Sequence, residues 1–99
     1  MGGPIDMSEN QTLKDHSNWT TRQVLAINVT YLRHENKWSQ EELADRTGRS
    51  VSLISDIENA NIGATIDAID DIGLAFGWTT SELTKDHGFV VTKKRVDGK

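Results

Sequence analysis

The sequence predicts an all-α domain of five short helices. Two observations support this prediction: a capping pattern that occurs three times, and apolar residues that recur at helical spacing. One six-residue pattern occurs three times, as WTTRQV from Trp19, WSQEEL from Trp38 and WTTSEL from Trp78. It consists of tryptophan, a hydroxyl residue, two further residues, glutamate or glutamine, and an aliphatic residue. The hydroxyl can accept a hydrogen bond from the first helical turn, and the acid or amide can bind the backbone N–H of the cap. The apolar residues around each cap have the spacing of a hydrophobic staple, so each tryptophan has a structural role.

Apolar periodicity and glycines place each helix. We expect helices over residues 21 to about 36, 40–47, 51 to about 58, 66–76 and 80 to about 85. Gly48 and Gly77 end the second and fourth helices, because glycine readily adopts the positive φ of a helix C-terminus. The residues expected to turn inward are Val24, Leu25, Val29 and Leu32 in the first helix, Val51, Ile54 and Ile57 in the third, and Ile66, Ile69, Ile72 and Phe76 in the fourth.

The composition limits the class of function. The chain has 99 residues, a formal net charge of -4 and no cysteine, so disulfides, thiolate zinc sites and a cysteine nucleophile are excluded. No apolar run approaches the roughly 20 residues that span a bilayer. The N-terminus has no signal pattern, so we expect a cytoplasmic protein with no membrane partner. No catalytic triad, carboxylate pair or metal-ligand cluster can be placed, and we therefore expect no enzyme activity, no metal and no cofactor.

Three segments are expected along the chain. Residues 1–18 are rich in Gly, Asn and Ser and are interpreted as a flexible arm, residues 19–85 as the helical domain, and residues 86–99 as a basic tail. The tail contains FVVTKKRV, whose β-branched residues favour a possible C-terminal β-strand. Such a strand could pair with the same strand of a second copy across a two-fold axis, or the tail could add positive charge to a binding surface.

Residues 22–83 resemble a known family. The matching residues are LR at 32–33, SQEELA at 39–44, Gly48, Ser50, LIS at 53–55, IEN at 57–59 and IDAIDDIGLAFGWTTSEL at 66–83. Through them the chain is similar to the Cro and phage-repressor class, or XRE family, of helix-turn-helix proteins. The resemblance implies a five-helix lambda-repressor-like fold whose third helix enters the major groove of double-stranded DNA, and a homodimer that binds two half-sites.

The resemblance implies roles for individual residues. Gln40 would hold a phosphate and brace the third helix, and Arg33 would form a buried structural ion pair with Glu58. The base-contacting residues would be Arg49, Val51, Ser52 and Ser55. The phosphate-contacting residues would be Gln40, Arg46, Asn59 and Asn61.

The sequence departs from the family pattern at two turns. Lys37 and Ala60 stand where the family usually has glycine, and residues 61–64 lack the basic residues that some members place there. We expect the fold to remain intact and binding to phosphates to be weak.

The acids of the helix-turn-helix segment need partners or an outward position. Glu42 is expected to complete the capping box at Ser39, and Asp45 to pair with Arg49 or to face water. Asp56 is expected to point away from the bases if Ser52 and Ser55 point toward them.

The expected function is a sequence-specific DNA-binding transcriptional regulator that acts as a homodimer on a palindromic operator. The alternative is a protein-interaction module on the same fold, for example an antitoxin or regulatory partner, because the acidic surface would suit a protein. A phage regulator, a restriction–modification controller and an antitoxin all stay open, as do the operator, the target gene and the direction of regulation.

Overall fold

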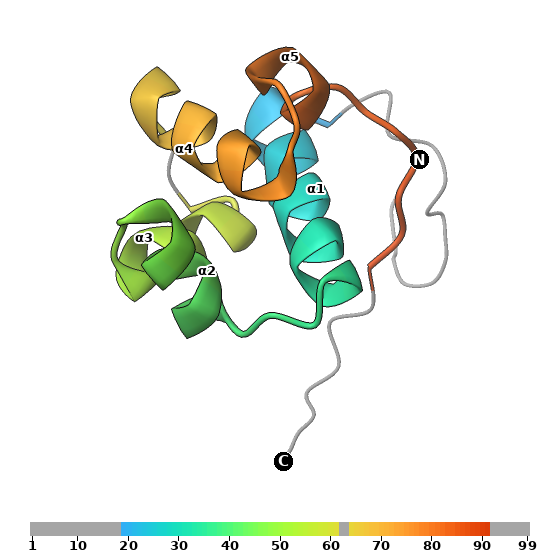
Figure 1. Cartoon of the computed structure of the whole chain (residues 1–99). Coiled ribbons are helices and arrows are strands. Elements are labelled where there is room, and N and C mark those ends of the chain that lie inside the picture. Colours follow the sequence, from blue (N-terminus) through green and yellow to red (C-terminus); the bar gives the residue numbers. More distant parts are fainter. Residues whose placement is uncertain (1–18, 62–63, 92–99) are drawn as a thin grey trace.

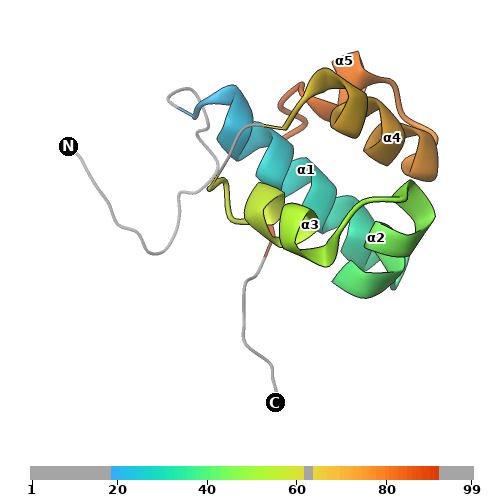
Figure 2. The same ribbon diagram turned by 90° about the vertical axis from the view of Figure 1, so that its left-hand side faces the viewer.

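The computed structural model describes residues 19–61 and 64–91, and this part of the chain is all-helical. Its five helices are α1 (Thr21–Glu35), α2 (Gln40–Thr47), α3 (Val51–Glu58), α4 (Ile66–Phe76) and α5 (Thr80–Leu83). Figure 1 shows α1 as the central rod, with α2 and α3 on one side of it and α4 and α5 above them. The view turned by 90° shows α3 lying across α1 (Figure 2). None of the described helices is long and apolar enough to cross a membrane.

One hydrophobic core joins all five helices. Its buried members are Leu25, Val29 and Leu32 from α1, Leu43 and Ala44 from α2, Ile54 and Ile57 from α3, Ile72 from α4 and Leu83 from α5. Trp38 and Trp78 pack against this cluster, as their place in the capping pattern predicts, and Trp38 also stacks on Phe76 with ring centroids 5.4 Å apart. Because each helix contributes to a single core, their relative positions are fixed by burial of apolar surface.

Hydroxyl side chains cap all five described helices. The caps are Thr20, Ser39, Ser50, Thr65 and Thr79, and each accepts a hydrogen bond from the third residue of its helix. The reciprocal bond of a full capping box is present at Thr20 with Gln23 and at Thr79 with Glu82. The bonds that Glu82 accepts from the backbone N–H and hydroxyl of Thr79 hold the pKa of that carboxyl below its ordinary value.

The capping box expected at Ser39 is only half formed. Ser39 accepts from the backbone N–H of Glu42 at 3.0 Å, but the Glu42 carboxylate pairs with Arg46 at 2.7 Å instead of returning to the cap. The prediction for Glu42 was therefore wrong. A guanidinium one turn later on the same face offers a charge-assisted bond, which is stronger than a bond from a neutral N–H.

Two residues expected to turn inward are exposed. Val51 is 38% exposed and Ile66 is 70% exposed, and each is the first residue of its helix. In both helices the residues predicted to turn inward are three positions apart, and three residues turn a helix by about 300°, which is about 60° short of a full turn. After two steps the first residue lies about 120° from the last, Ile57 or Ile72, which are the buried positions.

The chain after α5 returns along α1 (Figure 1). Phe89 stacks on Tyr31 of α1, with ring centroids 3.9 Å apart, and lies near Trp78 and His87. Residues 89–91 are not part of a strand, so the predicted C-terminal strand is absent from its described portion. The rest of that tail and the arm over residues 1–18 lie outside the described residues.

Candidate nucleic-acid interface

A three-residue turn sets the angle between α2 and α3. Gly48 ends α2 with φ 70°, in the left-handed region that glycine adopts at low cost. The backbone N–H of Arg49 donates to the carbonyl of Ala44 at 3.0 Å, and Ser50 then caps α3. The sequence therefore sets the helix-turn-helix geometry through one glycine and one serine.

A polar network fixes the far end of α3. Arg33 on α1 donates from Nε to Glu58 Oε2 at 2.6 Å and from Nη2 to Glu58 Oε1 at 2.9 Å. Its Nη1 donates to the carbonyl of Trp38 at 2.9 Å, and Gln40 Nε2 donates to Glu58 Oε1 at 3.0 Å. The side chains of Arg33 and Glu58 are only 13% and 4% exposed. The Arg33–Glu58 ion pair expected from the resemblance is thus present, and Gln40 braces the last residue of α3.

The outward face of α3 carries short polar side chains and no basic residue. Ser52 and Asn59 are exposed and Ser55 is half-buried, and Ser55 and Asn59 approach each other at 3.5 Å between Oγ and Nδ2. Asp56 is half-buried and follows Ser52 by four residues, which places the two within about 40° on the helix. The expectation that Asp56 points away from this face was wrong, because residues four apart share one face of a helix.

The two arginines beside this face are held by carboxylates. Arg46 pairs with Glu42 at 2.7 Å, and its guanidinium carbon lies 4.1 Å from the centre of the Trp38 ring. Arg49 donates from Nε and Nη2 to Asp71 Oδ2, at 3.1 and 2.7 Å, which ties the turn to α4. Asp45, the other partner considered for Arg49, is exposed.

Two turns flanking the motif contain strained residues. Lys37, between α1 and α2, has φ 59°, and Ala60, after α3, has φ 57°. These are the positions where glycine was missing from the sequence pattern, so each backbone keeps the left-handed geometry despite its side chain. Asn61, which follows Ala60, is exposed.

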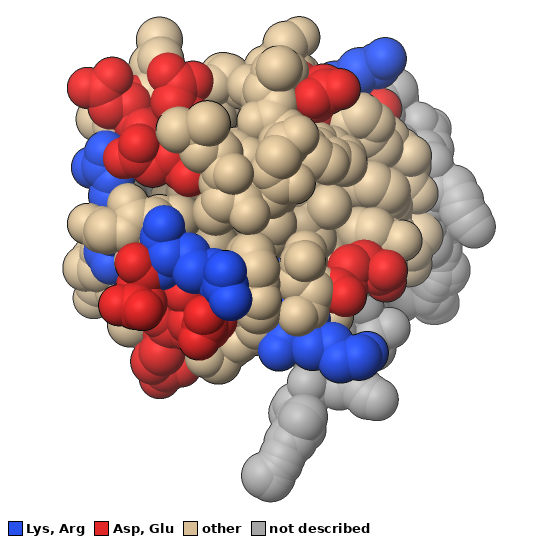
Figure 3. Space-filling view, viewed as in Figure 1, with Lys and Arg blue, Asp and Glu red and all other residues tan. Residues whose placement is uncertain are grey.

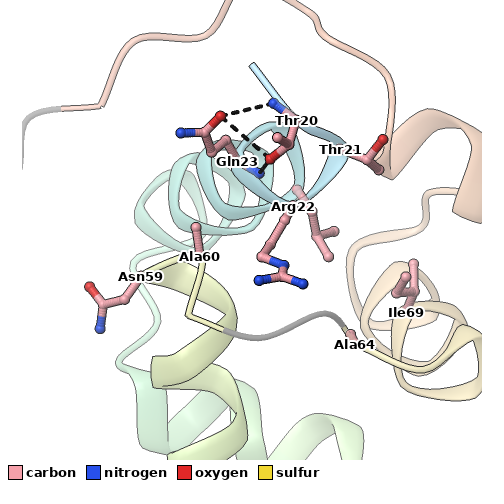
Figure 4. A pocket seen from close by; sticks show the side chains of 9 residues that line it. Thr20, Thr21, Arg22, Gln23, Asn59, Ala60, Ala64 and Ile69 are labelled. Carbon is pink, nitrogen blue, oxygen red and sulfur yellow. Dashed lines mark hydrogen bonds between the residues drawn. The ribbon is translucent and has the colours of Figure 1, made fainter. Parts of the chain in front are cut away.

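Arg22 is a nearby cation that the sequence analysis missed. Figure 4 shows its side chain pointing into an open hollow of about 800 Å³, lined by the start of α1, by Asn59 and Ala60 and by the start of α4. Arg22 forms no ion pair within the described part of the chain. A signal was available, since a basic residue in the first turn of a helix opposes the helix dipole and needs another reason to be there.

The charged surface mixes both signs. Figure 3 shows acidic side chains gathered over α4 and again over α2, with basic side chains between the two groups. Two ion pairs join charges of opposite sign here, Arg46 with Glu42 within α2 and Arg49 of the turn with Asp71 of α4. Each carboxylate offsets the charge of its arginine, so little uncompensated positive charge remains at these two pairs.

Comparisons with known proteins agree with this geometry. Residues 24–84 match the family model described as a helix-turn-helix domain. A hypothetical transcription factor, NHTF, from Neisseria has a similar structure, with TM-score 0.68 and 29% identity over 77% of this chain and 83% of that one. The structure of the clp gene regulator ClgR from Corynebacterium glutamicum is similar with TM-score 0.60 and 17% identity, over 65% of this chain and 68% of that one, which is a likeness of fold.

No curated protein matches the chain significantly in sequence. The family model covers more than half of the chain, including the whole of α2, the turn and α3. The chain belongs to the helix-turn-helix domain family.

Proposed function

We propose that this protein is a sequence-specific DNA-binding regulator of transcription that acts as a homodimer on a palindromic operator, with α3 in the major groove. The observation that carries the proposal is the outward face of α3, where short polar side chains stand exposed on a helix braced at Glu58 by Arg33 and Gln40. Short hydroxyl and amide groups can approach base edges closely. The relative with 29% identity is a hypothetical transcription factor, which favours the same class of function.

The residues divide into two groups by their proposed contacts. The base-contacting residues are Arg49, Val51, Ser52 and Ser55. The phosphate-contacting residues are Gln40, Arg46, Asn59 and Asn61, and we add Arg22. Gln40 uses one amide hydrogen on Glu58 and keeps the other for a phosphate.

Arg49 keeps part of its guanidinium available. Its Nε and Nη2 donate to Asp71, while Nη1 has no partner among the described residues. Asp71 would then orient the guanidinium without consuming all of its donors, as a carboxylate does when it accepts on one edge of an arginine.

The charge pattern predicts that a single protomer binds DNA weakly, and it therefore favours binding as a dimer. Each neutralised phosphate contributes about 0.9 to the dependence of log affinity on log salt. Because the cations of the motif are paired, we expect a shallow salt dependence and few contacts per protomer. A dimer doubles them by placing two α3 helices in half-sites one helical turn apart.

The alternative, a protein-interaction module on the same fold, is favoured by one observation. Leu74 and Ile66 on α4 are 77% and 70% exposed, and such apolar residues can contact a partner protein. The basic residues of the motif are also engaged within the protein.

Selection of duplexes from a random pool at low salt separates the two functions. The regulator is expected to enrich one palindromic motif, and a mass measurement in solution is expected to give two protein chains per duplex. If no motif emerges, the interaction module becomes the better account.

Single variants then test the proposed face. Ser52→Ala should weaken binding to the selected duplex about threefold to tenfold, the effect of one hydrogen bond, and leave the melting temperature unchanged. The matched control is Ser81→Ala on α5, an exposed serine away from α3. For Arg49→Ala, the control Asp71→Asn removes the same ion pair but keeps the guanidinium. Equal losses of affinity in these two would contradict a base contact by Arg49.

A further inference from the structure

Asp56 has a carboxylate that no residue in the described part of the chain neutralises. Glu58, the other acid of α3, is paired with Arg33, and the nearby acids Glu42 and Asp71 are paired with Arg46 and Arg49. The Asp56 carboxylate has neither a hydrogen bond nor an ion pair with any residue that the structure describes. It lies half-buried on the outward face of α3, close to Ser52 in angle.

An ionised carboxylate only accepts hydrogen bonds, and most of a duplex offers it acceptors. Phosphates, the O6 and N7 atoms of guanine and the O4 atom of thymine would all face it unfavourably. The donors in the major groove are the amino groups of cytosine and adenine, and adenine places its N7 acceptor beside that group. Cytosine is therefore the base that an unpaired carboxylate fits best.

The surroundings of Asp56 strengthen this constraint. α3 contains no basic residue that could shield the charge, and its neighbours on the same face are hydroxyls and an amide. If α3 enters the groove, the carboxylate must either meet an amino group or remain next to acceptors at a cost in free energy. The penalty applies to every DNA sequence that lacks the amino group at this position. Asp56 would therefore make a weakly binding protein discriminate between DNA sequences.

We propose that Asp56 is a specificity-determining residue that selects cytosine at one position of each half-site. This inference rests on the proposed function, since it requires α3 to lie in the major groove. It assigns to Asp56 a role that repulsion alone would not give, namely a preference for one base at one position.

The experiment compares duplexes selected from a random pool by the unaltered protein and by Asp56→Asn and Asp56→Ala. The unaltered protein should require cytosine at one position of each half-site. Asp56→Asn should shift that position towards adenine, because an asparagine amide can bind N6 and N7 of adenine together. Asp56→Ala should lose the preference there, about tenfold or more, with the other positions unchanged. Asp45→Asn on α2 is the matched control, since it removes the same charge from an exposed site off α3.

The outcomes separate the inference from the proposed function. If the unaltered protein selects a motif, and Asp56→Asn selects the same motif with uniformly higher affinity as Asp45→Asn does, Asp56 acts only by repulsion and the inference is overturned. If the unaltered protein selects no motif at all, the proposed function fails and the inference fails with it. A change of base at one position, confined to the Asp56 variants, supports both.

Discussion

Removal of the Arg33 side chain should destabilise the domain more than any other single loss of charge. In Arg33→Ala, Glu58 loses two charge-assisted bonds, at 2.6 and 2.9 Å, and the carbonyl of Trp38 loses a third at 2.9 Å. The Glu58 side chain is 4% exposed, so water cannot easily replace them, and only the bond from Gln40 remains. Breaking a buried pair by removing one partner typically costs about 3–5 kcal/mol.

Urea unfolding, followed by far-UV circular dichroism, measures this loss directly. For a domain of this size, a change of that magnitude should also lower the melting temperature by about 15 °C or more. The matched control is Arg22→Ala on the same helix, which has no ion pair among the described residues and should change stability by less than about 0.5 kcal/mol.

A double-mutant cycle separates the free energy of the Arg33–Glu58 ion pair from that of packing of the two aliphatic side-chain stems. Replacing Arg33 and Glu58 together by methionine removes both charges at once, so neither is left buried and unpaired. The double variant should therefore be more stable than the sum of the single losses predicts, by about 1–3 kcal/mol. Additive losses, or an Arg33→Ala variant as stable as the parent, would show that neither charge depends on the other for its stability in the fold.

Four further substitutions test local features of the fold. Lys37→Gly and Ala60→Gly relieve φ values of 59° and 57° and should each stabilise the domain by about 0.5–1 kcal/mol in urea unfolding, and a loss of stability would contradict left-handed strain. Gly73→Ala places a Cβ against the carbonyl oxygen of Trp78 and should cost about 1–3 kcal/mol by the same assay, whereas an unchanged midpoint would mean that the α4–α5 turn yields freely. The hydroxyl of Thr30 is buried with no partner among the described residues, so Thr30→Val should raise stability by about 1 kcal/mol, and a drop would reveal a hidden bond.

Local chemistry allowed much of the fold to be predicted. The boundaries of α2 follow from Ser39 at one end and Gly48 at the other, and those of α4 follow from Thr65 and Gly77. Each signal acts within a few residues of the chain, so neighbouring sequence is sufficient to recognise it. The turn after α3 keeps the left-handed geometry of a helix C-terminus although Ala60, and not glycine, occupies the position with positive φ.

Side-chain partners were harder to predict, because they depend on which helices meet. Arg49 and Asp71 are far apart in sequence and become neighbours only when α4 packs beside the turn. Glu42 had two local choices, the cap at Ser39 and Arg46, and the charge on Arg46 decided between them. The outward position of Asp56 could have been found from helical spacing alone, as it follows Ser52 by four residues.

Nuclear magnetic resonance shows directly whether the outward face of α3 contacts DNA. The labelled protein is titrated with the duplex it selects, and the backbone amide resonances are followed residue by residue. The largest shifts are expected at Ser52, Ser55 and Asn59, with α5 almost unaffected. Shifts concentrated around Leu74 on α4, with those of α3 unchanged, would contradict this contact.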